Sequence, residues 1–226
     1  MNKIKTILIS LLFFAIILQA CSPAYIPNVV NTPLLSNKGE FQAGIGTGIS
    51  GVDPQFTYAI TKNLGIMLNG SFCNRESSES SSSNYYHKHN FVETAAGYYT
   101  KVARNGRFSI FSGYGLGSVD AEYQNNLVSS QSKANIYRYF IQPDFGFTTK
   151  GFDGSFASRI VLVDVNKDGH SFSSYAEPVL TGKLGYRNFK FFLQTGLAIP
   201  LATSDNYDYQ PFILSFGMNF KFGVKE

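Results

Sequence analysis

From residue 39 to residue 222, apolar and polar side chains alternate with a period of two, and turn-forming residues interrupt the alternation at intervals. The last segment shows it most clearly, since Phe212 to Phe222 carries an apolar side chain at every second position. A period of two is typical of β-strands with one buried face. The pattern predicts ten strands, at residues 39–50, 52–61, 64–73, 91–102, 108–119, 136–149, 156–164, 176–187, 189–199 and 210–222.

The connections between these segments alternate in length from the third one onward. The long ones are residues 74–90, 120–135 and 165–175, and the short ones between them are 103–107, 150–155 and Asn188. Outer-membrane barrels combine short turns at one end with longer loops at the other, and a tilted strand needs about 9–11 residues to cross. We therefore predict an all-β fold, a single antiparallel up-and-down transmembrane β-barrel over residues 39–223, with about ten strands and eight as the alternative.

One face of the segments is aromatic and aliphatic, while the other is rich in glycine and carries few charges. An exposed face of a soluble barrel would need abundant charged residues, so we expect the apolar face to contact lipid and the polar face to line the lumen. Ten strands leave little room inside beyond their own side chains. Because an unpaired buried charge is costly, we expect the charged residues of that face to form an internal network: Glu40, Glu93, Arg138, Asp144, Glu177 and Lys183.

The N-terminus has the features of an export signal. Lys3 and Lys5 precede an apolar run at residues 7–18, too short for the roughly 20 residues of a membrane-spanning helix. The run ends in Leu-Gln-Ala-Cys, which resembles the lipobox of bacterial lipoproteins. That resemblance implies removal of residues 1–20 and a covalent lipid, including palmitate, on Cys21. Three prolines in residues 21–38 then predict an extended tether rather than a folded element.

The lipobox, the proline-bearing tether, the sequence GEFQAG at residues 39–44 and the aromatic last strand together resemble small bacterial outer-membrane β-barrel lipoproteins. The resemblance implies an outer-membrane location with lipid anchoring at the periplasmic face. The alternation of connections also places both the tether and the C-terminus on the periplasmic side. One detail departs from the pattern, because residues 223–226 follow Phe222 where such barrels usually end on an aromatic residue.

Composition narrows the function classes. Without Lys3 and Lys5 the chain has 17 basic and 15 acidic residues, a net charge of +2 that does not indicate a nucleic-acid partner. Cys21 and Cys73 are the two cysteines. With Cys21 lipidated, Cys73 has no intramolecular partner, so a disulfide scaffold is excluded and Cys73 is expected to be a small buried apolar residue.

Residues 164–169 match the first half of a calcium-binding EF-hand loop. Asp164, Asn166 and Asp168 supply oxygen ligands at the first, third and fifth positions, and a glycine follows at the sixth. The twelfth position, which should be glutamate, is Tyr175, and no flanking helices are predicted. A turn that closes a β-hairpin is therefore favoured over a calcium site.

The three histidines are candidates for metal or catalytic chemistry. His87 and His89 would share one face of a strand, but a third ligand is not evident in the serine-rich surroundings, which favours a polar outer loop. His170 and Ser171 are neighbours near Asp168, and adjacent strand residues point to opposite faces, which argues against a nucleophile and its base. Nucleophile-elbow, phosphate-loop and C-x-x-C motifs are absent from the sequence.

These patterns predict a non-enzymatic, lipid-anchored outer-membrane barrel. It would act as a structural or accessory subunit that presents the loops at residues 74–90 and 120–135. Outer-membrane lipid and other outer-membrane proteins are the expected partners, and the lipid on Cys21 is the only expected prosthetic group. Two alternatives stay open: a lipid-tethered soluble calycin-like barrel that binds an apolar small molecule, and an outer-membrane lipid-modifying enzyme.

Overall fold

A computed structural model describes residues 23–80, 83–125, 129–167, 169–203 and 208–223. The strands are β1 (Phe41–Gly48), β2 (Gly51–Ala59), β3 (Leu64–Ser80), β4 (Ser83–Lys101), β5 (Gly106–Asn125), β6 (Ser129–Thr148), β7 (Phe152–Asn166), β8 (His170–Tyr186), β9 (Phe189–Leu197), β10 (Ile199–Ala202) and β11 (Phe212–Phe222). Among these residues no helix has the length and apolarity needed to cross a membrane. The export signal and Cys21 lie outside the described residues.

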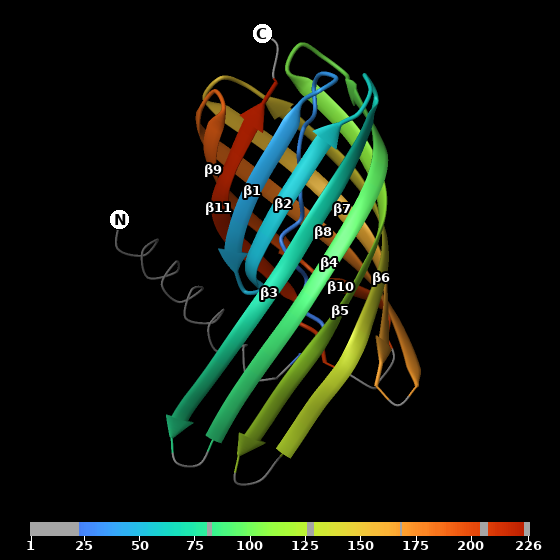
Figure 1. The fold of residues 1–226 in the computed structure, drawn as a ribbon, viewed down its shortest axis with the longest axis vertical. Coiled ribbons are helices and arrows are strands. Elements are labelled where there is room, and N and C mark those ends of the chain that lie inside the picture. Colours follow the sequence, from blue (N-terminus) through green and yellow to red (C-terminus); the bar gives the residue numbers. More distant parts are fainter. Residues whose placement is uncertain (1–22, 81–82, 126–128, 168, 204–207, 224–226) are drawn as a thin grey trace, which may run out of the picture.

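The strands form one closed antiparallel barrel (Figure 1). Each strand from β1 to β8 pairs with the next along the chain, and β11 closes the sheet by pairing with both β9 and β1. The short β10 follows β9 along the chain and pairs with β8, so β9 and β10 together form one wall strand. The prediction of a ten-stranded up-and-down barrel is confirmed, and the eight-stranded alternative is wrong.

The faces of the sheet are those expected from the alternation. Every strand exposes large apolar side chains on the outside, such as Ile45 on β1, Leu68 on β3 and Phe216 on β11. Soluble monomers rarely expose contiguous apolar patches of more than a few hundred square ångströms, whereas this surface encircles the molecule. Buried polar and charged residues line the inside. This arrangement of a lipid-facing exterior and a polar interior is that of a transmembrane β-barrel.

The prediction of long loops is wrong for most of the residues concerned, because these residues continue the strands. β3 and β4 remain paired as far as Ser80 and Ser83, and β5 and β6 as far as Gln124 and Ser129. The β7–β8 pairing likewise extends to Asn166 and His170. Figure 1 shows the β3–β4 and β5–β6 hairpins projecting well beyond the rest of the barrel. The polar residues of these stretches are paired by backbone hydrogen bonds, which require no apolar alternation.

The segment at residues 23–38 lies inside the barrel, whereas the sequence predicts an extended tether that precedes the barrel domain. Every residue from Pro23 to Leu35 is buried except Ile26, which is half-buried. The segment begins beside Asp208, at the end from which the hairpins project, and ends beside Lys101 at the short-turn end. In Figure 1 it is the blue thread that passes up through the lumen.

The two ends of the described chain consequently lie at opposite ends of the barrel. Ala24 and Tyr25 both donate backbone hydrogen bonds to the Asp208 carbonyl, in the connection between β10 and β11. Phe222 pairs with Phe41 at the other end, where the chain enters β1. The expectation that the tether and the C-terminus share one end of the barrel is therefore wrong.

Leu68 lies at the middle of the apolar surface of β3, and a charge there should destabilise the barrel. We expect Leu68→Arg to lower the free energy of unfolding by about 2–4 kcal/mol, as for charged residues at the bilayer midplane. Ser118→Arg is the control, because Ser118 is exposed on the outer face of β5 beyond the apolar residues. Denaturant titration in lipid vesicles measures both variants, and an equal effect would contradict the assignment of the outer surface.

Candidate functional site in the barrel interior

The wall of the barrel binds the backbone of the N-terminal segment through side-chain amides. Gln194 of β9 accepts a hydrogen bond from the Val30 N–H at 2.8 Å and donates one to the Val30 carbonyl at 2.9 Å. A glutamine amide has both a donor and an acceptor, so it can pair with a peptide group as a neighbouring strand would. Gln194 therefore replaces the sheet partner that an extended segment inside a lumen lacks.

Other wall side chains donate to successive carbonyl oxygens along the segment. They are Gln55 to Val29 at 2.8 Å, Gln142 to Asn31 at 2.8 Å, Lys183 to Thr32 at 2.6 Å and Gln42 to Pro33 at 2.6 Å. These donors come from β2, β6, β8 and β1, on different sides of the lumen. Buried backbone carbonyls need such partners, because leaving one unpaired costs about 1–3 kcal/mol.

A cluster of two arginines and two glutamates crosses the middle of the lumen. Arg138 of β6 pairs with Glu93 of β4, and Arg159 of β7 pairs with Glu177 of β8 at 2.7 Å. Arg159 also lies 3.4 Å from Glu93, so the two pairs join into one network. All four side chains are almost completely buried, and Arg138 additionally stacks 4.2 Å from the Phe91 ring centroid. The positive and negative charges of this network balance.

The N-terminal segment takes part in that network. Asn28 Oδ1 accepts hydrogen bonds of 2.8 Å from both Arg138 Nη2 and Arg159 Nη2. The Tyr25 hydroxyl donates to Glu177 Oε1 at 2.6 Å. A buried guanidinium needs its N–H donors satisfied, and Asn28 supplies an acceptor that the wall does not. A cavity of about 20 Å³ remains beside Tyr25 and Arg138, enough for about one water molecule.

A second charged group lies nearer the short-turn end. Asp153 of β7 pairs with Lys190 at 2.5 Å and with Lys221 at 2.9 Å. The Glu40 carboxylate accepts from the backbone N–H groups of Ser36 and Asn37, where the segment turns into β1. The Glu40 contacts hold the segment where it leaves the lumen.

The six charged residues expected in a lumen network are all buried on the interior face, but they do not form one cluster. Glu93, Arg138 and Glu177 are joined, whereas Glu40 binds the end of the segment and Lys183 binds its Thr32 carbonyl. Asp144 has no hydrogen-bond partner for either carboxylate oxygen among the described residues, although Lys183 is its charged neighbour. The expected network omitted further buried charges, among them Asp53, Arg107, Asp153, Arg159, Lys190 and Lys221.

The residues of the expected calcium loop belong mainly to strands. Asp164 and Asn166 end β7, and Asp168 lies outside the described residues. Asn166 pairs with His170 across a hairpin, and the Asp164 carboxylate binds His170 Nδ1 at 2.7 Å. This pair leaves Asp164 with a side-chain partner other than a metal. An Asp–His pair can orient a base but does not itself supply the nucleophile that covalent catalysis requires.

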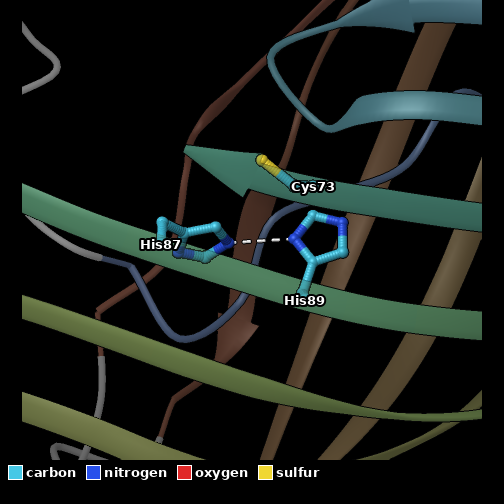
Figure 2. A group of neighbouring side chains, drawn as sticks. All are labelled: Cys73, His87 and His89. Atoms are coloured by element: carbon cyan, nitrogen blue, oxygen red, sulfur yellow. Dashed lines mark hydrogen bonds between the residues drawn. The ribbon is translucent and has the colours of Figure 1, made fainter. Parts of the chain in front are cut away.

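His87 and His89 lie on β4 with their side chains buried, and not in the outer loop expected from the sequence. Cys73 of β3 is opposite His89 in the strand register. Figure 2 shows the two imidazoles joined by a hydrogen bond of 2.9 Å, with the Cys73 sulfur beside them. Potential ligand atoms of all three residues lie within 4.8 Å of one another. Cys73 is thus buried as expected, but it stands beside two nitrogen ligands.

No family model and no curated protein matches the chain. Among solved structures, the crystal structure of Ail, the attachment invasion locus protein of Yersinia pestis, is similar at 10% sequence identity and a TM-score of 0.38. The similarity covers 82% of this chain and 99% of that chain. Such a distant similarity carries no functional inference.

A substitution at Asn28 tests the hydrogen bonds between the N-terminal segment and the two buried arginines. Asn28→Leu keeps the branched shape of the side chain but removes an acceptor shared by two buried guanidinium groups, so we expect the free energy of unfolding to fall by about 2–5 kcal/mol. Lys38→Ala, at an exposed position of the same segment, should change it by less than about 0.5 kcal/mol. Urea denaturation in detergent measures both, and a harmless Asn28→Leu would contradict the assigned network.

Proposed function

We propose that the protein is a non-enzymatic outer-membrane lipoprotein. Its own N-terminal segment fills the lumen of the barrel, and the barrel supports two long hairpins. The occupation of the lumen by residues 23–38 is the observation that carries this proposal. Wall side chains such as Gln194, Arg138 and Lys183 bind this segment, so they hold the interior of the protein together. The even number of strands and the short turns at one end support an outer-membrane location.

The hairpins β3–β4 and β5–β6 are the parts that such a protein would present to partners. Along β3 the exposed large apolar residues end at Phe72, and along β5 they end at Leu116. Both strands continue for eight or more residues beyond these positions. The hairpins therefore extend past the lipid-facing surface while they stay continuous with the barrel wall. In a structural or accessory role, the barrel would present these hairpins to other outer-membrane proteins.

The orientation of the faces argues against a soluble calycin-like barrel. That alternative needs an apolar interior to bind its ligand and a polar exterior in contact with water. Here the exterior is apolar on every strand, and the interior holds buried charges such as Arg159 and Lys190. A lipid-modifying enzyme would need a nucleophile or an activated water beside a base, whereas Glu177, Asp153 and Glu40 in the interior bind cations or peptide groups.

The route of the segment changes the expected place of the lipid. Cys21 is three residues before Ala24, so it can lie at most about 10 Å from it. The β1 strand of eight residues spans about 26 Å, which is well beyond that reach. A lipid on Cys21 would therefore lie at the end of the barrel with the long hairpins. If those hairpins face outward, as in other outer-membrane barrels, the lipid would enter the outer leaflet and not the inner one.

Membrane retention without the lipid tests the barrel as an anchor. A Cys21→Ser variant behind a cleavable export signal should remain in the membrane fraction and require detergent for extraction. Its gel mobility should shift on boiling, because a closed hydrogen-bonded barrel unfolds only on heating. The unsubstituted protein is the control for fractionation and for the mobility shift. A water-soluble product without a heat shift would overturn the membrane assignment.

Protease access to intact cells tests the position of the lipid. One variant carries a protease site between Ser22 and Pro23, and a second carries the same site after Glu226. We expect added protease to cut the first variant in intact cells and the second only after permeabilisation. The opposite result would place the long hairpins in the periplasm and the lipid in the inner leaflet. Cutting of both sites in intact cells would contradict the separation of the two ends.

A further inference from the structure

The group formed by Cys73, His87 and His89 has the donor set of a transition-metal site. His87 and His89 alternate along β4 and therefore face the same side, while the β3–β4 register places Cys73 opposite His89. Each side chain is more than nine-tenths buried. One thiol and two imidazoles suit thiophilic and borderline ions and do not suit calcium or magnesium, which prefer oxygen ligands.

The separation of the two imidazoles is close to that in a bound site. His87 Nε2 and His89 Nδ1 are 2.9 Å apart and share one hydrogen (Figure 2). Two nitrogens bound to one tetrahedral zinc ion at about 2.0–2.1 Å would lie about 3.3 Å apart. Metal binding would replace the shared hydrogen. The two nitrogens would separate by a few tenths of an ångström, both rings would turn toward the ion, and the Cys73 sulfur, now within 4.8 Å of both nitrogens, would move closer. The backbones of β3 and β4 can remain paired.

Neighbouring groups orient the ligands and offset the charge. Ser71 Oγ lies 3.0 Å from His89 Nε2, the nitrogen that points away from His87, and it can fix the ring tautomer. The Asp53 carboxylate is fully buried, faces Ser71 and acts electrostatically on Cys73. Its Oδ1 atom has no hydrogen-bond partner in the described part of the chain. A divalent ion, the Cys73 thiolate and Asp53 would together be neutral.

The nearest cations do not block the site. Arg75, on the same strand as Cys73, directs its guanidinium to the Gly48 carbonyl at 2.6 Å. Arg138 is bound to Glu93 and Asn28 in the central network. Both positive charges therefore have other partners, and the thiolate and Asp53 remain to balance a bound ion.

We propose that Cys73, His87 and His89 bind a thiophilic closed-shell ion, Zn²⁺ or Cu⁺, at the base of the β3–β4 hairpin. Three protein ligands suit trigonal Cu⁺, or Zn²⁺ with a further ligand in the fourth position. The site lies where β3 passes the last exposed apolar residue, Phe72. A bound ion would join β3 to β4 at this boundary and stiffen the projecting hairpin. The inference is independent of the lipid and of the side on which the hairpins lie.

Metal titration of the full-length protein tests the site. Protein purified in detergent and stripped with a chelator is titrated with Zn²⁺ against a chromophoric competitor, and separately with Cu⁺ under anaerobic reducing conditions. We expect one equivalent of metal to bind, and the ion with the lower dissociation constant is identified as the preferred one. Cys73→Ser, His87→Ala and His89→Ala should each weaken binding by about 100-fold or more, because even changes outside the ligand shell cost 10–100-fold.

His170→Ala is the matched control, because it removes a histidine that lies away from the group and is paired with Asp164. It should bind the metal as the unsubstituted protein does. Absence of stoichiometric binding, or equal binding by Cys73→Ser and His170→Ala, would overturn the proposal. Heat-dependent gel mobility shows whether each variant retains the barrel.

Cobalt supplies a readout that does not depend on the folding of any variant. Co²⁺ added to the stripped, unsubstituted protein should give a thiolate-to-metal charge-transfer band together with the visible bands of tetrahedral nitrogen and sulfur coordination. Subsequent addition of Zn²⁺ should remove both. Spectra that match octahedral aqueous Co²⁺ would exclude the Zn²⁺ form of the site, and together with a lack of Cu⁺ binding in the titration they would overturn the proposal.

Discussion

The peptide groups of the N-terminal segment must find hydrogen-bond partners inside a closed barrel, and much of the interior follows from this constraint. An extended chain in a lumen has no neighbouring strand, and water is largely excluded from the space around it. Side-chain amides of the wall supply these partners. The Gln194 amide, for example, pairs with both the N–H and the carbonyl oxygen of Val30. The prolines reduce the number of backbone donors that need a partner, because Pro23, Pro27 and Pro33 have no N–H group. A glutamine-lined wall and a proline-rich segment are thus complementary.

Close packing imposes a second condition on the same segment. A Cβ atom at Gly46 would lie 3.1 Å from a Val29 methyl carbon, and one at Gly65 would lie 2.8 Å from Leu35. Glycine at these wall positions leaves the volume that the apolar side chains of the segment occupy. Asn28 meets both conditions, because it occupies space in the lumen and accepts hydrogen bonds from the guanidinium groups of Arg138 and Arg159. The lumen is therefore a core built around one particular sequence.

The sequence was sufficient to predict the presence of the strands and the faces of all but the segment at residues 156–164, because a period of two needs no knowledge of the partner strand. Other features depend on register or on distant contacts. Residues 74–90 show no alternation, so they resemble a loop although they are paired throughout most of their length. Arg159 was missed because both faces of β7 carry apolar residues around it. Cys73 could join His87 and His89 only once the β3–β4 register was known.

The N-terminal segment was the largest error of prediction, and its physical cause bears on how the barrel forms. Prolines and a lack of periodicity are typical of a tether, yet the same features suit a chain whose partners are side chains and not a strand. Residues 23–38 precede β1, and β1 closes the barrel by pairing with β11. Threading the segment later would require passage between buried pairs such as Arg159 and Glu177, which would lack their full set of partners until it arrived. We therefore expect the closing β1–β11 seam to form around a segment already in place, because the segment directly precedes β1 in the chain.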